Sequence, residues 1–306
     1  MRPKNSFKGG IAAIVLVLLA TAPALAHDYW LAPEKFSVKK GESLVVRLHV
    51  GMALEPETER ELQKDRTERF ALVTSERAID LLEGAEDGTT PVLRRKMEDE
   101  GAVLLVMDRA FAFIELEDEK FSEYLEHEGL GEIEKLREKI GHRKKERERY
   151  KRCLKSLVRV VEEKGARPTG AGRLAGKVVG QDIEIVLLDD PFAAKPGTSI
   201  RAKVLFEGKP LAGKDVMAHH RGEETGFTRL EARTDANGVV AFRLEEAGLW
   251  VMRLVHMRIS SDKKAADWES FWAVYTFEIA GARDGGLSGE KNEGSKPGHI
   301  AKPGEE

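Results

Sequence analysis

The sequence predicts a mainly β protein with a helical insertion, in which an N-terminal β domain precedes a C-terminal immunoglobulin-like β-sandwich. Three observations lead to this prediction. Short β-branched and alternating runs fill residues 27–117, apolar residues at helical spacing follow from residue 118, and seven more strand-like runs occupy residues 178–280. The 306 residues carry a formal charge of −3 and one cysteine. A nucleic-acid partner and an internal disulfide are therefore not expected.

Residues 1–26 have the three-part pattern of a cleavable secretory signal peptide. The basic opening MRPKNSFKGG precedes an apolar run that ends in the small-residue pattern ALA at residues 24–26. We expect cleavage after Ala26, a periplasmic or secreted location and no membrane span in the mature chain. Under this interpretation His27 becomes the first residue of the exported protein.

The N-terminal β domain is expected over residues 27–117, where runs such as SLVVRLHV and GAVLLVMD alternate in the manner of strands. A helical insertion is expected over residues 118–164. Its first helix ends near Gly129, and a longer helical segment runs from Glu132 to Lys164, interrupted by the charged and solvated stretch GHRKKERERY. The Gly- and Pro-rich residues 165–177 are the expected linker.

The C-terminal sandwich is expected over residues 178–280, because turn signals such as AKPGT, EGKPLAG and DANG separate its seven strand-like runs. Residues 281–306 contain almost no apolar side chains and are expected to be disordered.

Histidines are the strongest leads to chemistry. No G-x-S-x-G, C-x-x-C, H-E-x-x-H or P-loop motif is present, so an enzyme is not expected. Once cleaved, His27 would offer both its α-amine and its ring to one cation. The alternative, that HDYW merely starts the fold, stays open. His256 lies on a strand that is apolar on both faces, which fits a ligand near a domain junction or an ordinary core histidine.

Other side chains are weaker candidates. Asp267 could supply a hard ligand, although a charged loop is the simpler interpretation of its surroundings. His219 and His220 are adjacent on an expected strand, so their rings should point to opposite faces and only one of them could join a given site.

Several ordered motifs together resemble a bacterial exported family of unknown function that is described as a NikM-like periplasmic nickel or cobalt uptake component. They are AHDYWLAP, KFSEYLEHEGL, ERYKRCLKSLV, RTDANGVVAFRLEEAGLWVMRLVHMR and ADWESFWAVYTFEI. The resemblance implies a metal role for His27, and it matches His256 and the segment from Asp267 to Ser270 to family positions. The GKPLAG and TDANG turns also resemble carboxypeptidase-regulatory-like sandwiches, which are binding or spacer modules.

These observations favour a periplasmic protein that binds a divalent transition metal, nickel or cobalt first and copper or zinc next, and passes it to a membrane transporter. The alternative is a non-catalytic cell-envelope module that binds a carbohydrate or protein partner through exposed Trp250, Trp268 and Trp272.

Overall fold

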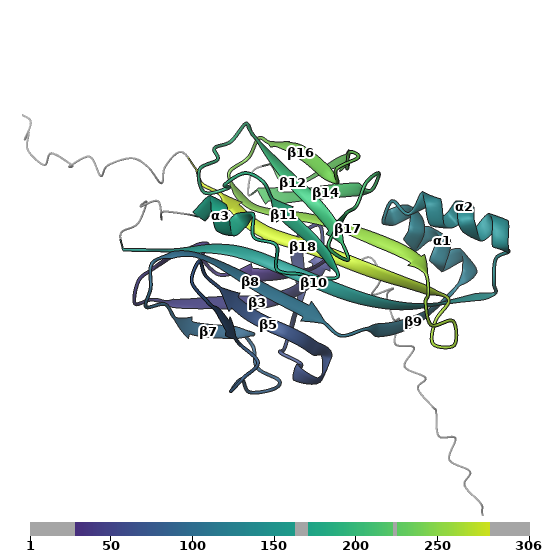
Figure 1. The fold of residues 1–306 in the computed structure, drawn as a ribbon, viewed down its shortest axis with the longest axis horizontal. Helices are drawn as coiled ribbons and strands as arrows, with labels where there is room; N and C mark the ends of the chain where they lie inside the picture. Colours follow the sequence, from purple (N-terminus) through teal and green to yellow (C-terminus); the bar gives the residue numbers. More distant parts are fainter. Residues whose placement is uncertain (1–27, 163–170, 223–224, 282–306) are drawn as a thin grey trace, which may run out of the picture.

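The computed structural model describes residues 28–162, 171–222 and 225–281 (Figure 1). Several sequence expectations therefore fall wholly or partly outside the described residues. They include the signal peptide, His27, residues 163–164 of the helical insertion, residues 165–170 of the linker, and the tail beyond residue 281. The described chain is mainly β with a helical insertion, which confirms the predicted fold class.

Three sheets make up the fold. The large sheet has the strand order β15-β14-β17-β18-β10-β8-β5-β6, with β2 and β9 also paired to β10. Its strands are β2 (Ser37–Lys39), β5 (Thr67–Val73), β6 (Ala78–Asp80), β8 (Gly101–Arg109), β9 (Ala112–Glu117), β10 (Lys145–Val161), β14 (Asp215–Gly222), β15 (Gly226–Arg233), β17 (Gly248–Ile259) and β18 (Trp268–Ile279).

A smaller sheet covers each face of the large one. The first joins β1 (Asp28–Pro33), β3 (Ser43–Met52), β4 (Glu55–Arg60) and β7 (Leu93–Lys96). The second joins β11 (Ile183–Leu187), β12 (Thr198–Phe206), β13 (Lys209–Pro210) and β16 (Val239–Leu244). In Figure 1 these two sheets lie on opposite sides of β10 and β18.

The large sheet has a core on both faces, and β8 shows this residue by residue. Leu104 and Val106 belong to the core shared with the β11–β16 sheet, whereas Leu105 and Met107 belong to the core shared with the β1–β7 sheet. Successive side chains of a strand point to opposite faces, so a strand covered on both sides is apolar throughout. The fold is thus a three-layer β structure at this point.

Two helices cover one end of the large sheet, at the right of Figure 1. They are α1 (Asp118–His127) and α2 (Gly131–Ile140); a short α3 (Ala171–Ala175) and a 3-10 turn η1 (Lys64–Arg66) complete the helical content of the described residues. Gly129 follows α1 at φ +70°, where the absence of a Cβ lets it end the helix, as the sequence predicts. In the parts of the chain that are described, no helix is both long and apolar enough to cross a membrane.

The helical prediction for residues 132–164 is wrong beyond Ile140, because Lys145–Val161 forms the long strand β10. Every residue from Cys153 to Val161 is buried. Cys153 and Leu157 face one core while Leu154 and Val158 face the other. A segment that is apolar on both faces satisfies helical spacing by coincidence, so periodicity does not distinguish the two structures.

Strand β10 also joins the two parts that the sequence separates. It pairs in parallel with β18 from the C-terminal part, and antiparallel with β8 and β9 from the N-terminal part. The expected domains of residues 27–117 and 178–280 therefore contribute strands to one continuous sheet.

A buried ion pair ties β10 to the second small sheet. Lys155 and Glu184 are each 1% exposed, and Lys155 Nζ donates to Glu184 and to the carbonyl of Ile185, 3.0 Å away. The Glu184 carboxylate also accepts backbone N–H groups from Val179 at 2.7 Å and Gly180 at 2.9 Å. Each charge is thus fully compensated only when the other is present.

A second buried acid lies beneath the helices. Glu148 of β10 accepts hydrogen bonds from the hydroxyls of Tyr124, at 3.2 Å, and Ser270. Burial raises the pKa of Glu148 to about 7, against the lowering effect of both hydrogen bonds and of Arg152. The folded protein therefore retains a proton that the unfolded chain releases at lower pH.

We expect Lys155→Met to destabilise the protein by about 3–5 kcal/mol, because it leaves the Glu184 carboxylate buried without a cation. Denaturant unfolding measures the change. Lys151→Met is the matched control, since Lys151 lies on the same strand but pairs with Glu68 and Asp182, whose side chains are half exposed. Equal losses in the two variants would contradict the assigned role of the buried pair.

The stability of Glu148→Gln relative to the wild type should increase as pH rises. The pKa of Glu148 is about 7 in the folded protein and 4.5 ordinarily. Between these values the unfolded chain ionises while the folded protein keeps its proton, so the free energy of unfolding of the wild type falls by about 3 kcal/mol in total as pH rises. Glutamine does not ionise and lacks this loss. Thermal unfolding of both proteins between about pH 4.5 and about pH 7 checks it, and a difference in Tm that is independent of pH would refute the expectation.

Candidate functional site

His256 and Asp267 lie apart in the fold. The His256 ring packs edge-on against Phe206, with ring centroids 4.5 Å apart. Burial, together with Lys214 and Arg258, lowers the pKa of His256 to about 4, so the ring is neutral at pH 7. His256 pairs with Phe271 in the β17–β18 ladder. Asp267 precedes Phe271 by four residues, which places it about 13 Å along the strand.

The Asp267 carboxylate is already engaged by two cations. It accepts hydrogen bonds from the side chain and backbone of Arg147, each at 3.1 Å, and forms an ion pair with Arg143. Burial would raise the pKa of Asp267, but these contacts outweigh it and hold the pKa below its ordinary value. The fold therefore does not bring His256 and Asp267 together, and the Asp267 carboxylate already faces Arg143 and Arg147.

The exposed-tryptophan surface of the alternative function is not present. Trp250, Trp268 and Trp272 are 1%, 2% and 4% exposed, and each belongs to a core cluster. A sugar or a protein partner cannot stack on rings that the fold already covers.

Asp28 and His219 form the polar contact that lies nearest to the predicted amino terminus. Asp28 is the first residue of β1, and its Oδ2 lies 3.2 Å from Nδ1 of His219 on β14. Both side chains are buried. Burial would raise the pKa of Asp28, yet Arg253 and the His219 hydrogen bond hold it below its ordinary value. The carboxylate is therefore an acceptor only, so His219 Nδ1 carries the proton and donates it.

The other ring nitrogen of His219, Nε2, therefore carries a lone pair that can bind a ligand. Nε2 of His219 is buried and has no hydrogen-bond partner among the described residues. A ring with Nδ1–H held by a carboxylate and with Nε2 unpartnered is the arrangement in which histidine binds transition metals.

Arg253 and Glu128 complete the cluster around Asp28. Arg253 Nε lies 2.9 Å from Asp28 Oδ1, and the two form an ion pair whose angles do not satisfy a hydrogen bond. Arg253 Nη2 donates a hydrogen bond to Glu128, the residue that follows α1. Glu128 also lies 3.0 Å from Nδ1 of His127. With both imidazoles taken as neutral, the two carboxylates and one guanidinium sum to a formal charge of −1. Local charge therefore favours a cation beside His219.

His220 points the other way, as adjacency on a strand predicts. Its Nδ1 lies 2.7 Å from the carbonyl of Leu249 and its ring stacks on Trp250, 4.8 Å between centroids. Of these two histidines, His219 is the one that faces the start of β1.

No group of three or more His, Cys, Asp or Glu side chains suited to a metal ion occurs within residues 28–162, 171–222 and 225–281. The described residues therefore contribute the Asp28–His219 pair, and His27, the residue bonded to Asp28, lies outside them. No local sequence motif marks Asp28, Glu128 and Arg253 as a cluster. They come together from distant positions, at the start of β1, just after α1 and within β17.

Comparison with known proteins identifies a family of unknown function. The family model described as "Domain of unknown function (DUF4198)" matches residues 24–258, most of the chain. No curated protein matches the sequence.

Among solved structures, the chain is similar to the D0-D1 domain of intimin, with 13% identity over 81% of this chain and 96% of that one, at a TM-score of 0.19. It is also similar to trypsin-activated α-2-macroglobulin from Escherichia coli, with 10% identity over 85% of this chain and 17% of that one, at a TM-score of 0.18. These TM-scores are too low to define a common fold.

Proposed function

This chain is a member of the DUF4198 family of domains of unknown function, and we propose that it binds a divalent transition-metal ion at the start of β1. Nickel or cobalt is the first choice, with copper or zinc next. The single observation that carries the proposal is His219, whose Nδ1 is held by Asp28 at 3.2 Å and whose Nε2 is buried and unpartnered among the described residues.

Asp28 acts in this proposal as the group that orients His219 and not as a ligand. Its two oxygens already face His219 and Arg253. A carboxylate behind a ligating imidazole fixes the tautomer and raises the basicity of the nitrogen that faces the metal. Arg253 balances only one of the two buried carboxylates, so a bound cation is favoured electrostatically.

His27 is the second proposed ligand. It lies outside the described residues, but it is bonded to Asp28, the residue that contacts His219. Cleavage after Ala26 would give His27 a free α-amine beside its imidazole, and these two groups chelate one ion. Together with His219 they would supply three nitrogen ligands, a set that suits nickel, cobalt, copper and zinc.

The same proposal includes a periplasmic location and a role as a metal carrier. An exported metal-binding protein with no catalytic motif fits a carrier that collects the ion in the periplasm and delivers it to a membrane transporter. The signal-like first 26 residues and the resemblance to a nickel or cobalt uptake component support this assignment.

The test is isothermal titration of untagged protein beginning at His27 with Ni²⁺, Co²⁺, Cu²⁺ and Zn²⁺. We expect His219→Gln to weaken binding by about tenfold or more, because it removes one metal–nitrogen bond. His256→Gln is the matched control, as His256 packs on Phe206 away from the cluster and should leave the affinity unchanged.

A second variant tests His27 without altering the described residues. Retaining Ala26 as one extra residue moves the α-amine away from His27 and should weaken binding by about tenfold or more. Equal affinities for the wild type, His219→Gln and the extended chain would overturn the proposal, as would the absence of binding to all four ions.

A further inference from the structure

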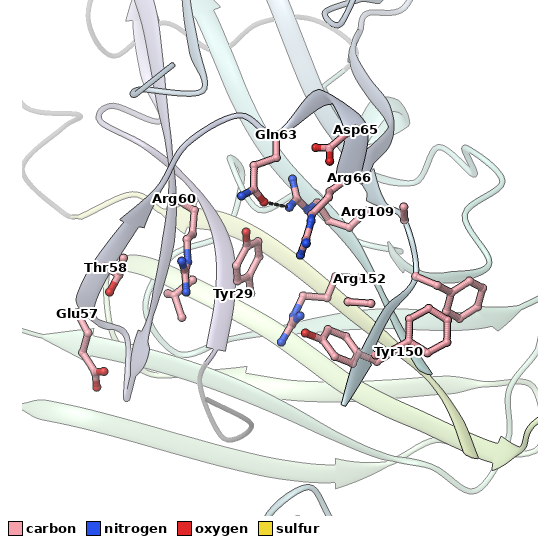
Figure 2. Close-up of a pocket in the computed structure, with 15 residues that line it drawn as sticks. Tyr29, Glu57, Thr58, Arg60, Gln63, Asp65, Arg66, Arg109, Tyr150 and Arg152 are labelled. Atoms are coloured by element: carbon pink, nitrogen blue, oxygen red, sulfur yellow. Dashed lines mark hydrogen bonds between the residues drawn. The ribbon is translucent and has the colours of Figure 1, made fainter. Parts of the chain in front are cut away.

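A separate hollow lies beside Tyr29, between the first small sheet and the edge of β10 (Figure 2). Its volume is about 810 Å³, and its lining includes residues of β1, β3, β4, η1, β8, β9 and β10. A cavity of this size is in the range that holds a small organic ligand. The metal proposal above uses none of its lining residues.

Four arginines face this cavity: Arg60 from the end of β4, Arg66 from η1, Arg109 from the end of β8, and Arg152 from β10. Glu57 and Asp65 are the acids in the lining, so its formal charge is +2 in a chain whose formal charge is −3. Figure 2 shows the arginines on more than one wall of the cavity.

Neither of the two inner arginines forms an ion pair with a described residue, although Arg152 lies near enough to the buried Glu148 to lower the pKa of that carboxyl. Arg109 is 9% exposed and donates to Thr67 Oγ1 at 2.8 Å and Gln63 Oε1 at 2.7 Å. Burial lowers the pKa of Arg109, and the neighbouring Arg152 and Arg66 lower it further. Its positive charge is thus positioned without a carboxylate contact.

Arg152 is positioned by aromatic rings. Its guanidinium carbon lies 5.0 Å from the ring centroid of Tyr29, 4.6 Å from that of Tyr150 and 5.2 Å from that of Trp272. Nε of Arg152 is buried and has no hydrogen-bond partner within the described chain. Cation–π contacts orient a guanidinium but leave its N–H groups available to an acceptor.

The outer arginines, Arg60 and Arg66, are exposed and form no ion pair with any residue that the structure describes. Arg109 and Arg152 likewise form no ion pair with a described residue, whereas the buried guanidiniums of Arg137 and Arg253 each contact two or more carboxylates. The cavity therefore gathers four guanidiniums that no described carboxylate pairs.

We infer that this cavity binds a small organic anion that carries at least two oxyanion groups, carboxylate or phosphate. Guanidiniums on separate walls need more than one anionic group to satisfy them, and their planar donor sets match both groups. Tyr29, Phe111 and Tyr150 supply apolar ring surface for the carbon skeleton of the ligand. A lone inorganic ion would leave most of an 810 Å³ cavity unfilled.

The experiment uses full-length mature protein freed of metal on a chelating resin, so that its outcome is independent of the metal site. Citrate and fructose 1,6-bisphosphate are the two organic probes, and sulfate is the inorganic reference. We expect at least one organic probe to bind more tightly than sulfate in isothermal titration. The organic probe that binds identifies the oxyanion group.

The paired variants are Arg60→Gln with Arg66→Gln, and Arg94→Gln with Arg95→Gln. Arg94 and Arg95 are exposed residues of β7 outside the cavity lining, so both double variants lose the same charge. The first pair should weaken binding of the organic probe by about tenfold or more, and the second should leave it near the wild-type value. Equal losses in the two double variants, or organic probes no tighter than sulfate, would overturn the inference.

Discussion

The parallel pairing of β10 with β18 is the contact on which the rest of the architecture depends. Residues 148–156 and 268–276 align in register, while β10 also pairs with β2, β8 and β9. Parallel neighbours need a long crossover connection, and here that connection contains the whole β11–β16 sheet together with β14, β15 and β17. Docking of these two strands therefore brings strands from the N-terminal and C-terminal parts of the described chain into one sheet.

The Asp28–His219 contact and the arginine-lined cavity both depend on that docking. They begin at consecutive residues of β1, since Asp28 contacts His219 and Tyr29 lines the cavity. Trp272 of β18 lies between them, with its ring centroid 5.2 Å from the guanidinium carbon of Arg152 and 5.5 Å from that of Arg253. One aromatic ring thus contacts a cation of each site, and both sites exist only when β1, β10 and β18 are packed together.

Local pattern was a reliable guide where one face of an element meets solvent. The helix α1 buries Phe121, Tyr124 and Leu125 on one side, and Gly129 ends it, so spacing and turn chemistry agree. The pattern misled where both faces are covered. The apolar residues of β10 satisfy helical spacing because they face two cores. The sequence does not show that the tryptophans are buried, because it does not show which apolar faces are covered.

Local sequence patterns were sufficient for the mainly β composition, the helix that ends at Gly129 and the opposite directions of His219 and His220, because these follow from periods of 3.6 and 2 within short segments. Contacts between distant segments determine which histidine meets Asp28, which arginines face a common cavity, and that Asp267 is paired with Arg143 and Arg147. Those choices depend on pairing between strands that are distant in the chain. Such pairing is set by the burial of whole sheet faces, which no local spacing encodes.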